Sequence, residues 1–467
     1  MRALFTLTYN TPMHKIRTAV FLLLLLPPGL SAQWTNLFDG KSLKGWHQKG
    51  GKAIYSVEKG QIVGETVEKE PNSFLCTDAE YGDFILELEL KVTENMNSGI
   101  QFRSLSKPEY QNGRVHGYQM EVDPSPRAWS GGIYDEARRD WLYIPNLNPA
   151  AKPAFRIGEW NHYRIEAIGN CIRTWVNGVP VAHLIDDLTP RGFIALQVHS
   201  IYGEMKPGMQ IRWRKIRIQT QNLQPRSWDA TPVVNLLPNN LSAQEKAQGF
   251  TLLFNGNDLS GWRAVNTRET PGPHWSVQDG QLQCAASDST EARSDLVNAQ
   301  EFSAFELCFD FLLREGANSG VKYFVDEKLE AGKSFGLGLE YQLLDDERHP
   351  DARQGAAGNR TLASLYDLIP AEKPEKRFLR KPGQWQQARI QVYPDGRVRH
   401  WLNGFMVVEY RRQSALFRAL VARSKYAHYE GFGMNTSGPI LLQDHGDAVA
   451  FRSIKVRRLR ESLLLCD

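Results

Sequence analysis

The stretch Gly117-Tyr118-Gln119-Met120-Glu121-Val122-Asp123 alternates apolar and polar side chains. Side chains on a β-strand point to opposite faces with a period of two, so this stretch predicts a strand with one face in the core. Its other face carries one amide and two carboxyls, from Gln119, Glu121 and Asp123. That polar face is either plain solvated surface or the floor of a polar cleft.

Five short motifs occur twice in the chain, in the same order. The pairs are Phe38–Trp46 with Phe254–Trp262, Asn97–Ile100 with Asn318–Val321, Gly158–Trp160 with Gly383–Trp385, Arg173–Gly178 with Arg399–Gly404, and Ile194–His199 with Ile440–His445. The spacing between the copies grows slowly along the chain, as small loop insertions in a shared scaffold would cause. The chain therefore contains two copies of one domain, and the repeat is too long for a solenoid.

A segment rich in proline and asparagine separates the two copies and reads as a linker. We expect a leader at 1–32, a first domain at 33–220, the linker at 221–248, a second domain at 249–460 and a tail at 461–467.

Within each copy, strand signals dominate. Alternating stretches occur at 84–92, 162–168, 211–218, 305–312 and 388–393, and Asn-Gly pairs typical of hairpin turns lie between some of them. Neither copy contains a convincing amphipathic helix. We predict an all-β protein of two tandem antiparallel β-sandwich domains, of the jelly-roll type.

The composition is that of an ordinary folded protein. The 467 residues carry a formal net charge of +4, which gives no reason to expect nucleic acid or an anionic membrane as a partner. A basic stretch precedes an apolar run at 19–26, and small residues follow near Ala32. This pattern predicts a signal peptide and an exported protein, periplasmic or extracellular, with no transmembrane segment in the mature chain. The five cysteines lack metal-binding or redox spacing, so buried free thiols are the simplest interpretation.

The motifs together resemble the 3-keto-disaccharide hydrolase family. The resemblance rests on the Phe-(Asp/Asn)-Gly-x-x-Leu-x-Gly-Trp, Asn-Ser-Gly-(Ile/Val) and Trp-x-Asn-Gly motifs, and on the closing strand in each copy. It covers nearly the whole mature chain, one copy per domain, and implies concanavalin-like or laminarinase-like jelly rolls that are commonly exported. Such folds place alternating acids on a concave strand, which favours the cleft interpretation of Glu121 and Asp123.

The equivalent strand of the second copy has a different order of polar residues. Aligning Gly117 with Gly338 sets Gln119 against Glu340, and Glu121 against Gln342. The amide and the carboxyl have exchanged places on the same face, which predicts two sites of related but different chemistry. One copy is then catalytic and the other mainly a binding domain, or both are active.

Several further residues are candidates for the two clefts. Expected catalytic residues are Glu121, Asp123, His199, Arg103, Glu340 and His445. Expected substrate-binding residues are Gln119, Gln197, Tyr134, Trp129, Gln342, Gln443 and Tyr366, with Trp129 and Trp141 as possible sugar platforms. His349 follows an acidic run and is interpreted as part of a solvated loop.

A 3-keto-glycoside has a C2 hydrogen made acidic by the neighbouring ketone. A base can remove it, the C1 substituent then leaves, and water adds to C1, a route that needs an acid, a base and donors for the enolate oxygen. Glu121 or His199 would be the base, Asp123 the acid or an orienting group, and Arg103 the enolate donor. A two-carboxylate glycosidase is the alternative mechanism.

No cofactor is firmly implied by the sequence. A divalent metal on the Glu, Asp and His side chains is possible and would polarise the ketone, but no ligand spacing is diagnostic. Two function classes therefore remain: an exported hydrolase acting on glycosidic bonds of 3-keto-disaccharides or related oxidised glycosides, and a tandem carbohydrate-binding protein without catalysis. In both, the partner is a carbohydrate.

Overall fold

The structure is a computed structural model that describes residues 33–92, 95–227, 229–267, 271–287, 293–329 and 334–460. The expected signal peptide at 1–32 and the tail at 461–467 lie outside the described residues. Within the described part of the chain, no helix is long and apolar enough to cross a membrane. The four cysteines that the structure describes are free thiols.

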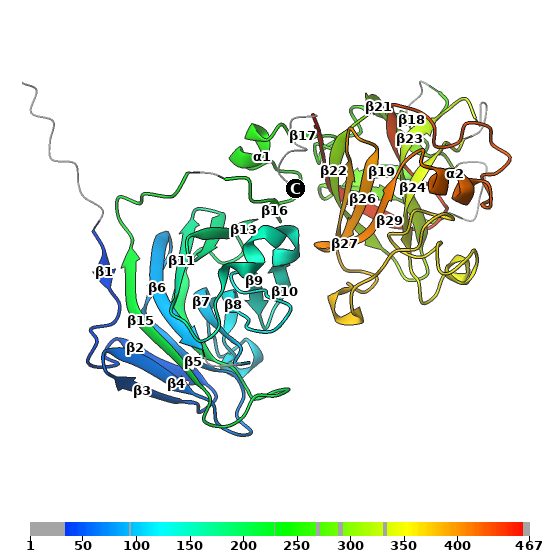
Figure 1. The fold of residues 1–467 in the computed structure, drawn as a ribbon. Helices are drawn as coiled ribbons and strands as arrows, with labels where there is room; N and C mark the ends of the chain where they lie inside the picture. Colours follow the sequence, from blue (N-terminus) through cyan, green and yellow to red (C-terminus); the bar gives the residue numbers. More distant parts are fainter. Residues whose placement is uncertain are drawn as a thin grey trace, which may run out of the picture.

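The first domain is a sandwich of two sheets (Figure 1). Its strands are β1 (Thr35–Asn36), β2 (Trp46–Gly50), β3 (Ile54–Glu58), β4 (Gln61–Glu65), β5 (Ser73–Tyr81), β6 (Phe84–Val92), β7 (Ser98–Leu105), β8 (His116–Val122), β9 (Ile133–Glu136), β10 (Asp140–Tyr143), β11 (Asn161–Ile168), β12 (Cys171–Val176), β13 (Val179–Ile185), β14 (Gly192–Val198) and β15 (Gln210–Gln219). Three 3-10 helices accompany them, η1 (Gln111–Gly113), η2 (Pro145–Leu147) and η3 (Pro149–Ala154). The strand order is β16-β13-β12-β11-β6-β15-β4-β3 in one sheet and β10-β9-β8-β7-β14-β5-β2 in the other, with β1 paired to β15. The edge strand β16 (Val233–Asn235) comes from the segment that follows the domain.

The two sheets of the first domain share one hydrophobic core. Leu86 and Trp213 from one sheet pack in the same buried cluster as Phe102, Met120 and Leu196 from the other. Burying the apolar side of each sheet against the other is what stabilises a sandwich, at about 25 cal/mol per Å² of apolar surface removed from water. The opposite side of the second sheet is left to carry polar side chains.

The second domain repeats this plan. Its strands are β17 (Thr251–Leu252), β18 (Trp262–Ala264), β19 (Trp275–Gln278), β20 (Gln281–Cys284), β21 (Leu296–Phe302), β22 (Phe305–Leu313), β23 (Asn318–Asp326), β24 (Leu337–Leu344), β25 (Gln386–Val392), β26 (Arg397–Leu402), β27 (Phe405–Arg411), β28 (Gly438–Leu442) and β29 (Val449–Arg458). They form sheets in the orders β19-β20-β29-β22-β25-β26-β27, with β17 on β29, and β18-β21-β28-β23-β24. The helical elements are η4 (Pro350–Arg353), η5 (Lys376–Phe378) and α2 (Ala415–Val421). The predicted all-β class and the tandem sandwiches are thus confirmed.

Helix α2 lies in the second copy, where the sequence analysis finds no convincing helix. Its N-cap Ser414 accepts a hydrogen bond from the backbone N–H of Phe417, whose ring is buried in the domain core. Seven residues make only two turns, too few to show a helical period, so tertiary packing and the cap stabilise this element.

The segment between the domains is attached to both of them. Strand β16 (Val233–Asn235) pairs in parallel with β13 at the edge of the first domain. Helix α1 (Ala243–Ala247) follows with a capping box formed by Ser242 and Glu245, and Glu245 pairs with Lys455 of β29 at 2.5 Å. The side chain of Asn239 donates to Gly280 O at 2.7 Å and accepts from Ser453 N at 2.8 Å. The segment therefore fixes the second domain against the first instead of acting as a loose tether.

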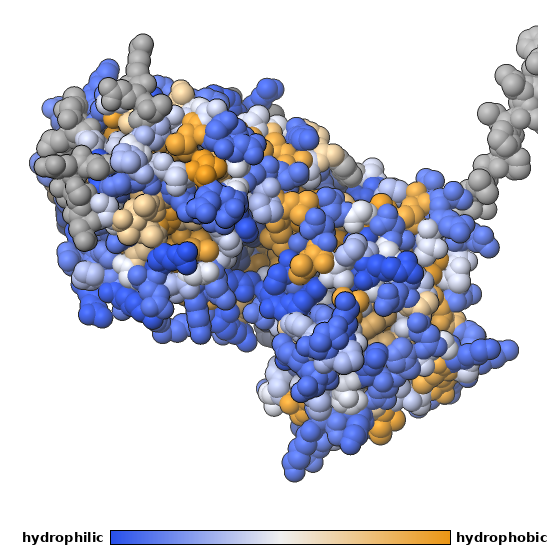
Figure 2. Space-filling model, turned by 180° about the vertical axis from the view of Figure 1, so that it is seen from behind, coloured by the Kyte–Doolittle hydropathy of each residue, from blue (hydrophilic) through white to orange (hydrophobic). Residues whose placement is uncertain are grey.

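The two domains lie side by side, and the chain near residues 370–380 extends from the second domain toward β9 and β10 of the first (Figure 1). Seen from behind, the boundary between them is hollowed and has both apolar and polar side chains beside it (Figure 2). The candidate site lies at this boundary.

Candidate functional site

Three neighbouring strands of the first domain bring the polar row together. Glu121 of β8 is paired with Gly99 of β7, and Ile100 is paired with Leu196 of β14, so Gln197 flanks Gly99 on the side opposite Glu121. A carboxyl and an amide thus stand on either side of a residue that has no side chain.

Gly99 is needed because another side chain lies across it. A Cβ atom at this position would come within 2.2 Å of Cδ of Gln119. Gln119 in turn accepts a hydrogen bond from Gln101 at 2.8 Å and donates to Glu121 Oε2 at 3.0 Å. The Asn-Ser-Gly motif therefore makes room for the amide that orients the carboxyl.

Glu121 is 3% exposed and is held by neutral amides. Its Oε1 accepts from Asn97 Nδ2 at 2.6 Å, in addition to the bond from Gln119. Burial raises the pKa of Glu121 to about 8; the Asn97 bond lowers it, and the charge of Asp123 raises it. Most Glu121 side chains are consequently protonated near neutral pH and can donate a proton.

His199 lines the same cleft in the opposite protonation state. Burial lowers the pKa of His199, against a hydrogen bond with the Ser200 carbonyl that raises it. The Nδ1 atom lies 2.7 Å from Ser200 O, so Nδ1 carries the proton and donates it, because a carbonyl only accepts. The Nε2 atom is left as an unprotonated base.

Gln197 is fully buried, and neither its Oε1 nor its Nε2 has a hydrogen-bond partner among the described residues. Such a group costs free energy in the folded chain unless something else bonds to it. Because Gln197 lines the cleft, its amide is available to a ligand hydroxyl or carbonyl.

Asp123 does not point into this group. Its carboxylate accepts from Arg127 Nε at 2.8 Å, from Ser125 N at 3.1 Å and from Trp129 N at 3.2 Å. These bonds shape the 123–130 loop, so Asp123 orients the wall of the cleft and acts on Glu121 through its charge.

Arg103 is also directed away from the polar row. A β-bulge shifts the register between Phe102 and Leu105, and Arg103 has a φ of 46°. Its guanidinium donates to Gly82 O at 2.9 Å, Gly169 O at 2.8 Å and Asp83 at 3.0 Å. The even spacing from Gln101 fails to predict a shared face because the bulge inserts an extra residue.

The aromatic candidates line the cleft beside the polar row, and Tyr134 of β9 is paired with Gln119 of β8. Trp129 is 2% exposed and donates from Nε1 to Asn146 at 3.0 Å, while Trp141 packs against its edge with ring centroids 4.7 Å apart. Tyr134 packs on Trp141 at 5.2 Å and donates to Asp140 at 3.1 Å. Trp129 therefore supports the wall, and the half-buried Trp141 and Tyr134 present more of their surface.

The cleft has a volume of about 930 Å³ and is lined by both domains. From the first domain it includes Glu121, Gln119, Gln197, His199, Asn97, Tyr134, Trp129 and Trp141; from the second it includes Pro374, Glu375, Arg377, Phe378 and Phe405. The polar face of β8 is therefore the floor of a cleft and not an open surface.

The second domain keeps the strand register but changes the groups. Gly320 pairs with Gln342, and Lys322 pairs with Glu340, which places Gln342 where the first domain has Glu121. The exchange of amide and carboxyl thus occurs on equivalent positions. A Cβ on Gly320 would lie 2.4 Å from Glu340 Oε1, the same close approach that Gly99 makes to Gln119.

Glu340 is in a different electrostatic environment from Glu121. Burial raises its pKa, whereas the charges of Lys322 and Lys425 lower it. Lys425 lies over the ring of Tyr366 at 4.2 Å, and Tyr366 donates to Asp351 at 2.7 Å. The polar face of the second domain is thus packed with its own charged partners. Gln342 Oε1 is occupied by Leu343 N at 3.1 Å, whereas Gln443 Oε1 has no hydrogen-bond partner among the described residues.

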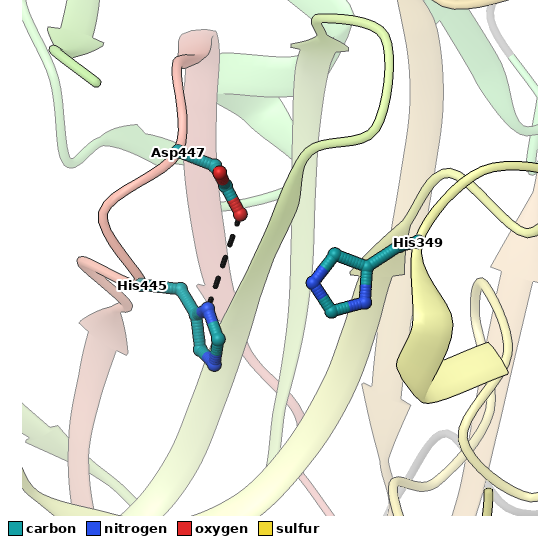
Figure 3. A group of neighbouring side chains, drawn as sticks. All are labelled: His349, His445 and Asp447. Atoms are coloured by element: carbon teal, nitrogen blue, oxygen red, sulfur yellow. Dashed lines mark ion pairs between the residues drawn. The ribbon is translucent and has the colours of Figure 1, made fainter. Parts of the chain in front are cut away.

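His445 belongs to the one group of described side chains that converge as metal ligands would. One ligand atom each from His349, His445 and Asp447 lie within 4.8 Å of one another (Figure 3). His445 Nδ1 is 3.9 Å from Asp447 Oδ2, and His349 Nδ1 accepts from Asp351 N at 3.2 Å. Two imidazoles and one carboxylate are a donor set that suits zinc and similar ions. In the first domain, Asp123 is bonded to its own loop, so it does not join Glu121 and His199 in a comparable set.

Many residues that line the cleft are not indicated as site residues by the sequence, among them Asn97, Phe378 and Phe405. Asn97 holds Glu121, and Phe378 and Phe405 reach the cleft from the second domain. The repeat of Asn-Ser-Gly marks Asn97 in the sequence, but nothing there indicates which loop of one copy covers the other.

Comparison with known proteins places the chain in a family. A model of the 3-keto-alpha-glucoside-1,2-lyase-like domain matches residues 33–219 and again 249–457, so the chain belongs to this family and carries two copies of its domain. This membership supports a glycoside hydrolase-type function on carbohydrate.

The chain is also similar to individual proteins. A 3-keto-disaccharide hydrolase of Bacteroides thetaiotaomicron is 35% identical over 236 residues, covering 46% of this chain and 79% of that protein. A solved structure from Parabacteroides distasonis, described as a "putative glycosyl hydrolase", is 29% identical, with a TM-score of 0.42 over 48% of this chain and 100% of that chain. The carbohydrate-binding module CBM66 from Bacillus subtilis is 16% identical, with a TM-score of 0.28 over 38% of this chain and 95% of that one.

Proposed function

We propose that the cleft of the first domain hydrolyses glycosidic bonds of 3-keto-disaccharides or related oxidised glycosides. The observation that carries the proposal is the pairing of two oppositely tuned groups in one cleft: Glu121, whose pKa is raised to about 8, and His199, whose pKa is lowered. An acid that keeps its proton and a base that has lost it, both near neutral pH, are what an elimination needs.

In the proposed reaction, His199 Nε2 removes the proton from C2 of the oxidised ring. The electron pair moves into the C2–C3 bond and onto the ketone oxygen, then returns to form a C1–C2 double bond as the C1–O bond breaks. Glu121 gives its proton to the leaving oxygen. Water then adds across the double bond, with hydroxide to C1 and a proton to C2, which restores the 3-keto sugar.

The developing negative charge on the ketone oxygen needs a donor. Gln197 Nε2 fits this role because it is buried, lines the cleft and has no partner among the described residues. It replaces Arg103, whose guanidinium is committed to the 82–83 and 169 loops.

The second domain is proposed to be non-catalytic. Its equivalent of Glu121 is the amide Gln342, which has no proton to give as an acid. Burial raises the pKa of its carboxyl Glu340, and the charges of Lys322 and Lys425 oppose that rise. We also propose that the chain is exported, because the pattern at 1–32 is that of a signal peptide. Oxidised glycosides outside the cytoplasm would then be within its reach.

The full chain should be incubated with 3-keto-trehalose in D₂O and followed by NMR. Release of the sugar with deuterium at C2 is expected, because the C2 proton exchanges with solvent during elimination and hydration. Turnover without deuterium would instead indicate a two-carboxylate glycosidase mechanism. If the protein binds glycans but releases no sugar, the hydrolase proposal fails and the tandem binding protein remains.

A further inference from the structure

One part of the lining of the cleft is largely aromatic and is shared by the two domains. Trp129 and Trp141 of the first domain meet Phe378 and Phe405 of the second. The ring centroid of Phe378 lies 5.3 Å from that of Trp129 and 5.2 Å from that of Phe405. Phe378 and Phe405 are only half-buried, so apolar ring surface remains available in the cleft.

The segment that carries Phe378 is held in place at both ends. At its start, Glu372 N donates to Val407 O at 2.8 Å, and Lys373 forms an ion pair with Asp346. At its end, Arg380 donates to Arg139 O of the first domain at 3.0 Å. The contacts at the start hold the loop to its own domain, and the Arg380 contact at its end holds it against the first domain.

Phe405 is fixed by a second contact between the domains. It follows the hairpin turn at Gly404, which has a φ of 85°. A Cβ atom on Gly404 would lie 2.9 Å from Cγ1 of Ile144 in the first domain, so glycine permits the turn to sit directly on that residue. The attachment of β16 and Asn239 to different domains holds the same arrangement from the linker side.

Polar groups surround this aromatic surface. Arg127 stacks over Trp129 at 4.3 Å, and Arg377 forms an ion pair with Glu375 at 3.1 Å at the rim. An apolar ring surface with a polar rim suits a flat ring that has one apolar face and hydrogen-bonding groups at its edge. Sugar rings and aryl groups share this chemistry.

We propose that Phe378 and Phe405 of the second domain, together with Trp141, form the subsite for a ring-shaped leaving group of the glycoside cleaved in the first domain. The proposal rests on the function proposed above. The oxidised ring lies over the amides and the carboxyl of the floor, and the group bonded to C1 extends onto the aromatic wall. The second copy thereby selects the substrate for the first, since a leaving group as small as methoxide does not cover the aromatic surface.

The test compares three substrates with the full chain: the methyl, p-nitrophenyl and glucosyl glycosides of 3-keto-glucose. Phe378→Ala and Phe405→Ala are expected to raise KM about tenfold for one or both ring leaving groups, and to leave the methyl glycoside within about twofold. The substrate whose KM rises more, the p-nitrophenyl or the glucosyl glycoside, identifies the kind of ring that the aromatic surface binds. Phe335→Ala is the matched control, because Phe335 is an exposed phenylalanine of the same domain that does not line the cleft.

An equal rise in KM for all three substrates would overturn the proposed subsite. So would an unchanged KM for both ring substrates. If the wild type turns over none of the substrates, the proposed function fails, and the subsite is then tested by binding. Quenching of tryptophan fluorescence by the same three glycosides should still show affinity for ring-bearing glycosides that falls about tenfold in Phe378→Ala and not in Phe335→Ala. Equal affinities in the two variants would reject the subsite independently.

Discussion

The two domains share a strand register and differ in what surrounds one carboxyl group. In the first domain, Glu121 is bonded to the amides of Asn97 and Gln119; burial and the charge of Asp123 raise its pKa, and the charge of Arg127 lowers it. In the second domain, Glu340 lies two residues before the position equivalent to Glu121, and burial raises its pKa while the charges of Lys322 and Lys425 lower it. Burial is thus the largest influence on both carboxyls, but the nearby charges differ. The same fold places two carboxyls in different electrostatic surroundings.

The largest expected effect separates the two carboxyls. Glu121→Gln should lower kcat by about 10²- to 10⁴-fold, because the leaving oxygen loses its proton donor. Glu340→Gln should change kcat by less than about threefold, because Glu340 lies in the domain proposed to be non-catalytic. Steady-state rates on a 3-keto-disaccharide measure both, and comparable losses in both variants would indicate two active domains.

Thermal unfolding serves as the control for Glu121→Gln. A carboxyl whose folded pKa is raised from 4.5 to about 8 favours the folded state below its unfolded pKa, and this stability is lost as the pH rises through the folded pKa. The glutamine variant carries no such dependence. Its Tm should therefore equal or exceed that of the wild type near pH 8, which shows that lost activity does not come from unfolding.

The next effect compares Gln197 with its equivalent Gln443. Gln197→Leu should lower kcat/KM by about 10- to 100-fold, since a buried hydrogen bond to the substrate is worth about 1–3 kcal/mol. Gln443→Leu, at the equivalent place in the second domain, should leave kcat/KM unchanged. Both variants should retain or gain thermal stability, because each removes a buried amide atom that has no partner among the described residues. If turnover is unchanged in Gln197→Leu, the amide of Gln197 takes no part in the reaction.

The pH dependence of kcat/KM is a smaller effect on the same comparison. Activity requires neutral His199 and protonated Glu121, so it should rise below pH 6.5 to a plateau and fall above pH about 8, by roughly tenfold per pH unit. Glu340→Gln should not move either limb. If kcat/KM instead rises through pH 8, Glu121 is the base and the assignment of the two roles is reversed.

The smallest expected effect on turnover concerns Arg103. Arg103→Ala should destabilise the first domain by about 1–3 kcal/mol, because two backbone carbonyls and Asp83 lose a charged donor. The turnover of folded molecules should stay within about threefold of the wild type. Urea unfolding measures the change in the free energy of unfolding. Rates measured at temperatures below the unfolding transition give the turnover of the folded molecules. If the variant folds fully but its kcat falls by about 10²-fold, Arg103 takes part in the reaction after all.

Local periodicity was sufficient for most of the fold. The alternation around Glu121 and the repeated motifs predict the strands, the two sandwiches and the equivalence of Glu121 with Gln342, because strand register depends on a two-residue period. The positions of Glu121, Gln197 and His199 in one cleft follow from the same pattern.

The remaining features depend on contacts that a local pattern does not contain. The bulge that redirects Arg103 is a single inserted residue, and the bonds that turn Asp123 into its own loop come from Arg127, Ser125 and Trp129. The approach of Phe378 and Phe405 to the first domain is set by packing between residues more than 200 positions apart. Periodicity predicts which way a side chain faces, but it gives no information about which distant loop lies above it.

The direct contact of the Gly404 turn with Ile144 also bears on what the covalent linkage of the two domains provides. Without the second domain, the cleft of the first would be open on the side where Phe378 and Phe405 lie. The first domain would need a longer loop of its own, or a second molecule, to close that side. Joining the two domains in one chain provides the closing surface at a fixed ratio of one to one, independent of protein concentration.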